Sequence, residues 1–244
     1  MTERLLEGLY HFQTEVFEAN RQLFEKLALG QQPEILFITC SDSRISPTLL
    51  TQTGPGELFI LRNAGNLIPP FTPQGGGEAA TIEYAVQVLG VKHIVVCGHS
   101  DCGAMKALFN HPENLEDLPA VKSWLAMAEP IKRIVKAVYP DRNGVELIDA
   151  AIEENVRVQM ENLHTHPSVA AAIRQGKLHI SGWVYNIRTG QVLAYEPAIK
   201  AFQSALAAWQ TQTGSFKKLP PRSERPIGVN GSGSNTWLEQ VTRH

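Results

Sequence analysis

A short apolar run, Ile35-Leu36-Phe37-Ile38, leads through Thr39 to Cys40 and then into the polar turn Ser41-Asp42-Ser43-Arg44. Four to eight apolar, β-branched or aromatic residues bounded by a turn are typical of a strand that is buried on both faces, as in a parallel sheet. The run therefore predicts a buried strand with Cys40 at its carboxyl end.

Two more runs of this kind follow, Leu58-Phe59-Ile60-Leu61 and His93-Ile94-Val95-Val96-Cys97, and the second leads into Gly98-His99. Between them, residues 78–89 have helical spacing. Residues 178–185 and 191–195 predict a strand, a tight turn and a returning edge strand. This order of strands and helices predicts an α/β fold, with a largely parallel sheet flanked by helices.

The rest of the chain divides into three parts. Apolar residues at helical spacing over 2–29 predict an N-terminal helical arm, residues 1–30. The central domain is expected over 31–210; residues 118–175 are mostly helical in pattern, and the alanine-rich segment 201–208 predicts a helical packing face. Residues 211–244 are rich in Pro, Gly, Ser and basic residues, which predicts a C-terminal tail without a core of its own.

Composition limits the functional classes. A chain of 244 residues is long enough for one well-filled domain, and a net charge of −2 gives no sign of a nucleic-acid or anionic-membrane partner. No apolar run is long enough to span a membrane and no secretory signal is recognisable, so a cytoplasmic protein is expected. Three cysteines make a poor disulfide framework and favour metal binding or catalysis.

Cys40, His99 and Cys102 are the candidate metal ligands. Two of them follow strand ends, which meet at one edge of a parallel sheet, and thiolate with imidazole is a donor set that zinc accepts, with a fourth position left open. The alternative is that they are ordinary core residues. Cys97 should face away from this edge as a small buried side chain, whereas Asp42 and Arg44 are close enough to pair.

At this point the sequence resembles the β-class carbonic anhydrases. Three segments carry the resemblance, which extends over about 9–198: Cys40-Ser-Asp-Ser-Arg44, Arg62-Asn-Ala-Gly-Asn66 and Gly98-His-Ser-Asp-Cys-Gly103. It implies zinc held by Cys40, His99 and Cys102, and a catalytic dyad of Asp42 and Arg44. It also implies a four-stranded parallel sheet with an antiparallel edge strand, and N-terminal helices that embrace a partner, so that the protein is a homodimer or a higher homo-oligomer.

The function implied is the reversible hydration of carbon dioxide to bicarbonate and a proton. The family's substrate pocket corresponds to Gln31, Phe59, Ala64 and Tyr84, some of them contributed by the neighbouring subunit. Two alternatives stay open: a hydrolase of a related molecule such as carbon disulfide, and a zinc-stabilised scaffold protein without turnover.

One subtype of the family is regulated by bicarbonate, and its dyad aspartate can replace water on zinc. Arg62 and Tyr185 match that subtype, but Phe37 stands where it has tryptophan. Loss of the indole N–H favours the other subtype, in which the aspartate stays paired with its arginine. No histidine is assigned as proton shuttle. The resemblance to carboxysomal members suggests that the tail contacts a carboxysome scaffold protein.

Overall fold

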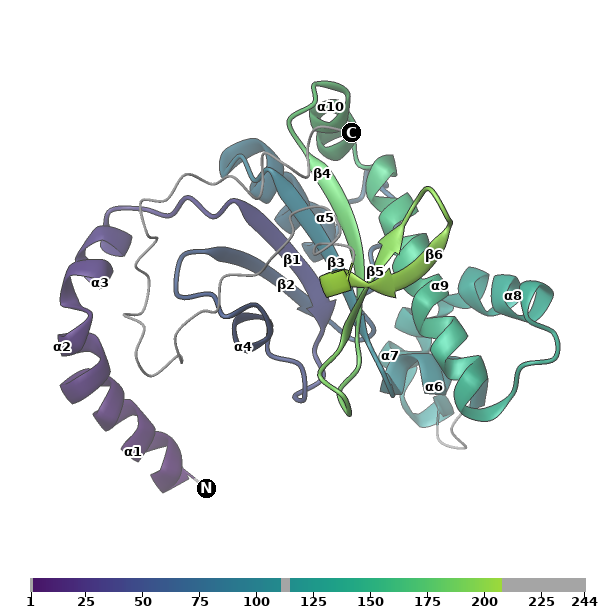
Figure 1. Cartoon of the computed structure of the whole chain (residues 1–244), viewed down its shortest axis with the longest axis horizontal. Helices are drawn as coiled ribbons and strands as arrows, with labels where there is room; N and C mark the ends of the chain where they lie inside the picture. Colours follow the sequence, from purple (N-terminus) through teal and green to yellow (C-terminus); the bar gives the residue numbers. More distant parts are fainter. Residues whose placement is uncertain (1, 111–114, 208–244) are drawn as a thin grey trace.

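The computed structural model describes residues 2–110 and 115–207. A single six-stranded sheet, in the order β2-β1-β3-β4-β5-β6, forms the centre of the body (Figure 1). Its strands are β1 (Ile35–Cys40), β2 (Leu58–Asn63), β3 (His93–His99), β4 (His179–Tyr185), β5 (Val192–Glu196) and β6 (Ala201–Ser204).

The first four strands are parallel, and β5 returns antiparallel beside β4. This confirms the predicted fold class, and β6 adds one further antiparallel strand beside β5. The helix predicted over 201–208 was wrong at Ala201–Ser204. Pairing with β5 and the contact of Phe202 with Tyr195, whose ring centroids are 5.4 Å apart, override the helical preference of alanine.

Helices cover the sheet because its central strands are apolar on both faces. On one face, Leu36 and Ile38 of β1 pack in a cluster with Ile82, Val156 and Val169 from three helical segments. The helical elements of the body are α4 (Pro47–Thr51), α5 (Gly77–Glu83), a π-helical turn (Tyr84–Val88), α6 (Gly103–Asn110), a 3₁₀ turn (Leu115–Asp117), α7 (Pro119–Ala126), α8 (Glu129–Val138), α9 (Gly144–Thr165) and α10 (Pro167–Arg174).

The N-terminal segment lies apart from the sheet (Figure 1). It consists of α1 (Thr2–His11), a π-helical turn (Phe12–Val16), α2 (Phe17–Ala19) and α3 (Arg21–Ala28). None of these residues is buried, although the segment carries large apolar side chains such as Leu5, Leu6 and Leu9. No helix in residues 2–110 or 115–207 is long and apolar enough to cross a membrane. The predicted tail, 211–244, lies outside the described residues.

Two glycines let α9 approach the sheet closely. A methyl group at Gly98 of β3 would lie 2.9 Å from Val156 Cγ2, and one at Gly182 of β4 would lie 2.7 Å from Val156 Cγ1 and 2.5 Å from Met160 Sδ. Real Cβ atoms essentially never come so close to neighbouring atoms. The distance between α9 and the two strands therefore depends on the absence of a side chain at these positions.

We expect Gly182→Ala to destabilise the fold by about 1–3 kcal/mol, because the added methyl group must push α9 off β4. Urea unfolding at fixed protein concentration measures this as a lower midpoint. The matched control is Gly77→Ala at the first residue of α5, where nothing lies within 4 Å of the added carbon. Equal midpoints for the two variants would contradict the close-approach explanation.

Candidate metal centre and active site

Cys40, His99 and Cys102 lie together at the carboxyl ends of β1 and β3. Their ligand atoms are all within 4.8 Å of one another, and all three residues are buried. Cys40 ends β1 and His99 ends β3, the strand paired beside it. Asp101, with a left-handed φ of 61°, turns the chain so that Cys102 comes back to the same point. Parallel pairing and one turn thus bring the three donors together.

The donor atoms are arranged as a cation requires. His99 Nδ1 lies 2.9 Å from the Ser100 carbonyl oxygen, to which it can donate, and this leaves the lone pair on Nε2. That buried Nε2 has no hydrogen-bond partner among the described residues. The backbone N–H of Gly65 donates to Cys40 Sγ at 3.3 Å. An orphaned imidazole nitrogen beside two sulfurs is the pattern of a metal site rather than of a packed core.

Electrostatics favour positive charge at this point. The hydrogen bond with Cys102 lowers the pKa of the Cys40 thiol to about 4, and the same contact raises the pKa of Cys102. Burial opposes protonation of His99, but the Cys40 sulfur, the Ser100 carbonyl and the Asp42 carboxylate outweigh it and raise the pKa of His99. Cys40 is thus the thiol of the pair that ionises more readily, and binding of a metal ion by the two thiols would release protons.

Cys97, the third cysteine, takes no part in the cluster. It is fully buried in β3, and burial raises the pKa of its thiol to about 12. It packs with Phe37, Ile45 and Val95. This is the small buried side chain that its position in the strand predicts.

Asp42 and Arg44 form a bidentate ion pair next to the cluster. Arg44 Nε donates to Asp42 Oδ1 at 2.9 Å and Nη2 donates to Oδ2 at 2.8 Å. The Arg44 backbone N–H also donates to Oδ1, at 2.9 Å. These hydrogen bonds hold the pKa of Asp42 well below its usual range, with Arg44 the main cause. Asp42 Oδ2 lies 3.9 Å from His99 Nε2, so an ionised carboxylate adjoins the cluster.

Asp101 gives Arg44 a second acidic partner that the sequence analysis did not assign. Arg44 Nη1 donates to Asp101 Oδ2 at 2.9 Å, and Nη2 donates to its carbonyl oxygen at 3.2 Å. Lys106 pairs with the other oxygen of the Asp101 carboxylate. The sequence position of Asp101 could have indicated this role, because the residue lies between the two candidate ligands His99 and Cys102.

Arg62 holds the turn that carries the dyad. Its guanidinium donates to the carbonyl oxygens of Cys40, Asp42 and Ile45 at 2.7–3.0 Å. These contacts give Arg62 a structural task in this chain. Phe37, where the regulated subtype has tryptophan, is buried and packs edge-on against Trp183.

The predicted substrate residues separate into two groups. Ala64 lies beside the cluster: its carbonyl accepts a hydrogen bond from Trp124 Nε1 at 2.7 Å, and it lines an almost wholly apolar cavity of about 490 Å³ together with Gly103. Phe59 instead pairs with Leu36, four residues before Cys40, which places it about 13 Å from the strand end.

Tyr84 lies beside Phe59, with ring centroids 5.9 Å apart, and Gln31 precedes β1 on the surface. One chain therefore does not bring Gln31, Phe59 and Tyr84 to its own metal cluster.

Comparison with known proteins agrees with this geometry. The carbonic anhydrase family model matches residues 35–192. A carbonic anhydrase from Synechococcus elongatus is 52% identical over 190 residues, which cover 78% of this chain and 70% of that protein. One from Pseudomonas aeruginosa is 48% identical, covering 82% and 90%.

Similar solved structures identify the class within this family. The β-carbonic anhydrase CcaA superposes with a TM-score of 0.80 at 45% identity, covering 83% of this chain and 98% of that chain. The Coccomyxa β-carbonic anhydrase in complex with acetazolamide superposes with a TM-score of 0.68 at 30% identity, covering 85% and 90%. The chain therefore belongs to the carbonic anhydrase family, and within it to the β class.

Proposed function

We propose that this chain catalyses the zinc-dependent reversible hydration of carbon dioxide to bicarbonate and a proton. The observation that carries the proposal is the buried Cys40, His99 and Cys102 cluster, with its orphaned His99 Nε2, beside the ion-paired Asp42. Family membership supports the same reaction.

Cys40, His99 and Cys102 would hold the zinc ion, since two sulfurs and one imidazole nitrogen are ligands that zinc prefers. Bound zinc lowers the pKa of water at the site towards neutrality. Three protein ligands leave the fourth position of a tetrahedral zinc ion open. Arg44 binds both oxygens of Asp42, at 2.9 and 2.8 Å. This pairing supports the expectation that Asp42 stays with Arg44 rather than joining the metal ligands.

Asp42 is proposed to orient the attacking water. An ionised carboxylate can only accept hydrogen bonds, so it takes the O–H of the water and turns an oxygen lone pair towards the substrate. Arg44 keeps the carboxylate ionised and in place, and Asp101 and Lys106 hold Arg44 from the other side. The apolar cavity next to Ala64 offers a weakly polar space of the kind that carbon dioxide needs.

We expect Asp42→Ala to lower the turnover of carbon dioxide hydration roughly 10²-fold, because the water loses its orienting acceptor. Stopped-flow hydration at mildly alkaline pH measures the loss, and metal analysis should find the zinc content unchanged. Asp141→Ala, at an exposed loop position, is the matched control and should keep full turnover. Loss of zinc together with turnover would contradict the assigned role of Asp42.

The same assay tests the metal and the two alternative functions. Removal of the metal with a chelator should abolish turnover, and added zinc should restore it. A zinc-loaded protein that hydrates no carbon dioxide would overturn the proposal. Turnover of carbon disulfide by that protein would then favour the hydrolase, and inactivity on both would favour the scaffold.

We propose further that the active unit is at least a homodimer, in which Gln31, Phe59 and Tyr84 serve the metal site of the partner. The separation of these residues from the cluster of their own chain supports this arrangement. The arm formed by α1, α2 and α3 supports it too, because its large apolar side chains are not covered by the described residues of its own chain. One related structure is described as that of tetrameric β-carbonic anhydrases from Sordaria macrospora.

A mixing experiment tests whether the site is shared. Tyr84→Ala and Asp42→Ala are each expected to be impaired alone. If Tyr84 acts on the partner's site, half of randomly mixed dimers carry one intact site out of two, and turnover recovers to about one quarter of the wild-type value. Co-purified mixed protein of known mass gives the measurement. Turnover equal to the mean of the two parents would place Tyr84 and Asp42 in the same chain's site.

The tail, residues 211–244, is proposed to dock on a carboxysome scaffold protein, so that the enzyme works in the cytoplasm or within a carboxysome. The supports are the resemblance of the body of the chain to carboxysomal members, the basic residues of the tail, and the cyanobacterial sources of two relatives. Truncation after Gln210 should abolish pull-down of the scaffold protein while leaving turnover intact. Unchanged pull-down would exclude the tail as the docking segment.

A further inference from the structure

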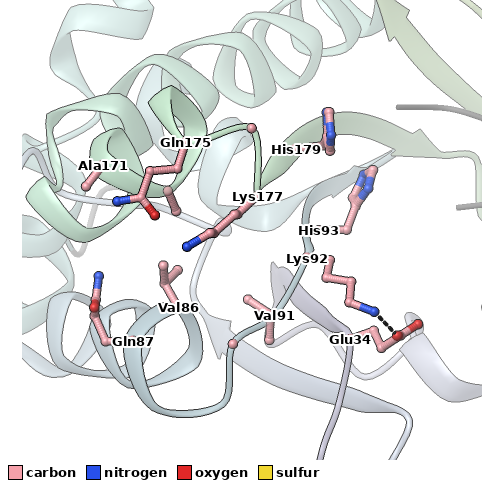
Figure 2. A pocket seen from close by; sticks show the side chains of 13 residues that line it. Glu34, Val86, Gln87, Val91, Lys92, His93, Ala171, Gln175, Lys177 and His179 are labelled. Atoms are coloured by element: carbon pink, nitrogen blue, oxygen red, sulfur yellow. Dashed lines mark hydrogen bonds and ion pairs between the residues drawn. The ribbon is translucent and has the colours of Figure 1, made fainter. Parts of the chain in front are cut away.

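A cavity of about 690 Å³ lies at the amino ends of the parallel strands, opposite to the metal cluster (Figure 2). Glu34 just before β1, Lys92 and His93 at β3, and Lys177 and His179 at β4 line one side of it. His93 begins the strand that His99 ends, which separates the two sites by about 20 Å. The cavity is therefore no part of the candidate active site.

The walls combine an apolar floor with exposed polar side chains at the rim. Val86, Val91 and two alanines of α10 form the apolar part, and Gln87 and Gln175 stand at the ends of the two helical segments. Figure 2 shows the Lys177 side chain extended into the space between Gln175 and Val86. Such a mixture of apolar surface and a few convergent polar groups is the usual make-up of a ligand site.

Charge in the cavity is unbalanced. Lys92 Nζ pairs with Glu34 Oε1 at 2.6 Å, so these two charges largely cancel. Lys177 forms no ion pair with any described residue, and the amides of Gln87 and Gln175 have no hydrogen-bond partner there either. One full positive charge and two amide groups thus face the cavity without protein partners.

His93 adds a buried donor. It is 9% exposed, and its Nε2 lies 2.8 Å from Ser181 Oγ. Burial, followed by the nearby His179, lowers the pKa of His93 to about 4, so the ring is neutral near pH 7. When the Ser181 hydroxyl donates to Nε2, the ring proton resides on Nδ1, which makes no hydrogen bond to a described residue. His179 stands beside it, with ring centroids 6.4 Å apart.

We propose that this cavity is a second ligand site, which binds a small anion through a carboxylate or phosphate group. Lys177 supplies the charge, His93 and the two glutamines supply neutral hydrogen bonds, and Lys92 borders the site with Glu34. The carbonyl ends of the two helical segments also face this edge and offset part of the lysine charge. A small anion with about one negative charge would neutralise what remains.

Calorimetric titration of the full-length, zinc-loaded protein with inorganic phosphate and, separately, with acetate tests the site and distinguishes phosphate from carboxylate. At least one probe should bind, and Lys177→Gln should weaken that binding at least about tenfold through loss of a charged hydrogen bond. The matched control, Lys136→Gln on the exposed side of α8, should bind as the wild type does.

Histidine NMR signals locate the binding, because anions can also approach the metal. The ring signals of His93 and His179 should shift on titration in the wild type and not in Lys177→Gln, whereas carbon dioxide hydration by Lys177→Gln should stay at the wild-type rate. Absence of these shifts with both probes would overturn the proposal. A change of oligomeric mass in Lys177→Gln would overturn it too, since the cavity would then be a contact between subunits.

Discussion

Parallel pairing of β1 with β3 is the constraint on which the rest of the site depends. Its register places Thr39 opposite Cys97, so Cys40 and His99 leave the sheet at the same edge. A shift of one strand by one residue would turn its donor to the opposite face of the sheet, away from the donor of the other strand. The register is held by buried apolar side chains on both faces and by Thr39, whose hydroxyl donates to the Cys97 carbonyl at 2.8 Å.

A polar network then connects the long helix α9 to the metal cluster. Asn155 Nδ2 donates to the Gly65 carbonyl at 2.9 Å, and Gln159 Oε1 accepts the Ile68 N–H at 2.6 Å. The Gly65 N–H in turn donates to Cys40 Sγ. Because Gly98 and Gly182 allow α9 to lie close to the sheet, two buried amides of this helix reach the loop after β2 and position a donor to a candidate metal ligand.

The two ends of the parallel strands carry different chemistry because loops follow the strands at one end and helical segments precede them at the other. At the carboxyl ends, the chain turns through polar loops that present sulfur, imidazole and carboxylate. At the amino ends, helical segments finish and lysines complement their carbonyl dipoles, which leaves Lys177 facing a cavity. A doubly covered parallel sheet thus separates the metal cluster from a cavity bordered by Lys177.

Local sequence determined much of this protein. The apolar runs ending at Cys40 and Cys97 were enough to predict the parallel strands and the edge at which three donors meet, because strand burial and turn chemistry are local properties. Asp42 and Arg44, two residues apart, could be paired for the same reason. Asp101 as a partner of Arg44, Arg62 as the clamp on the dyad turn, and the strand at Ala201–Ser204 depended on contacts between segments far apart in the chain. Only the tertiary structure placed Phe59 and Tyr84 away from the cluster and opened the cavity at Lys177, since position along a strand relative to distant loops is set by packing and not by neighbouring residues.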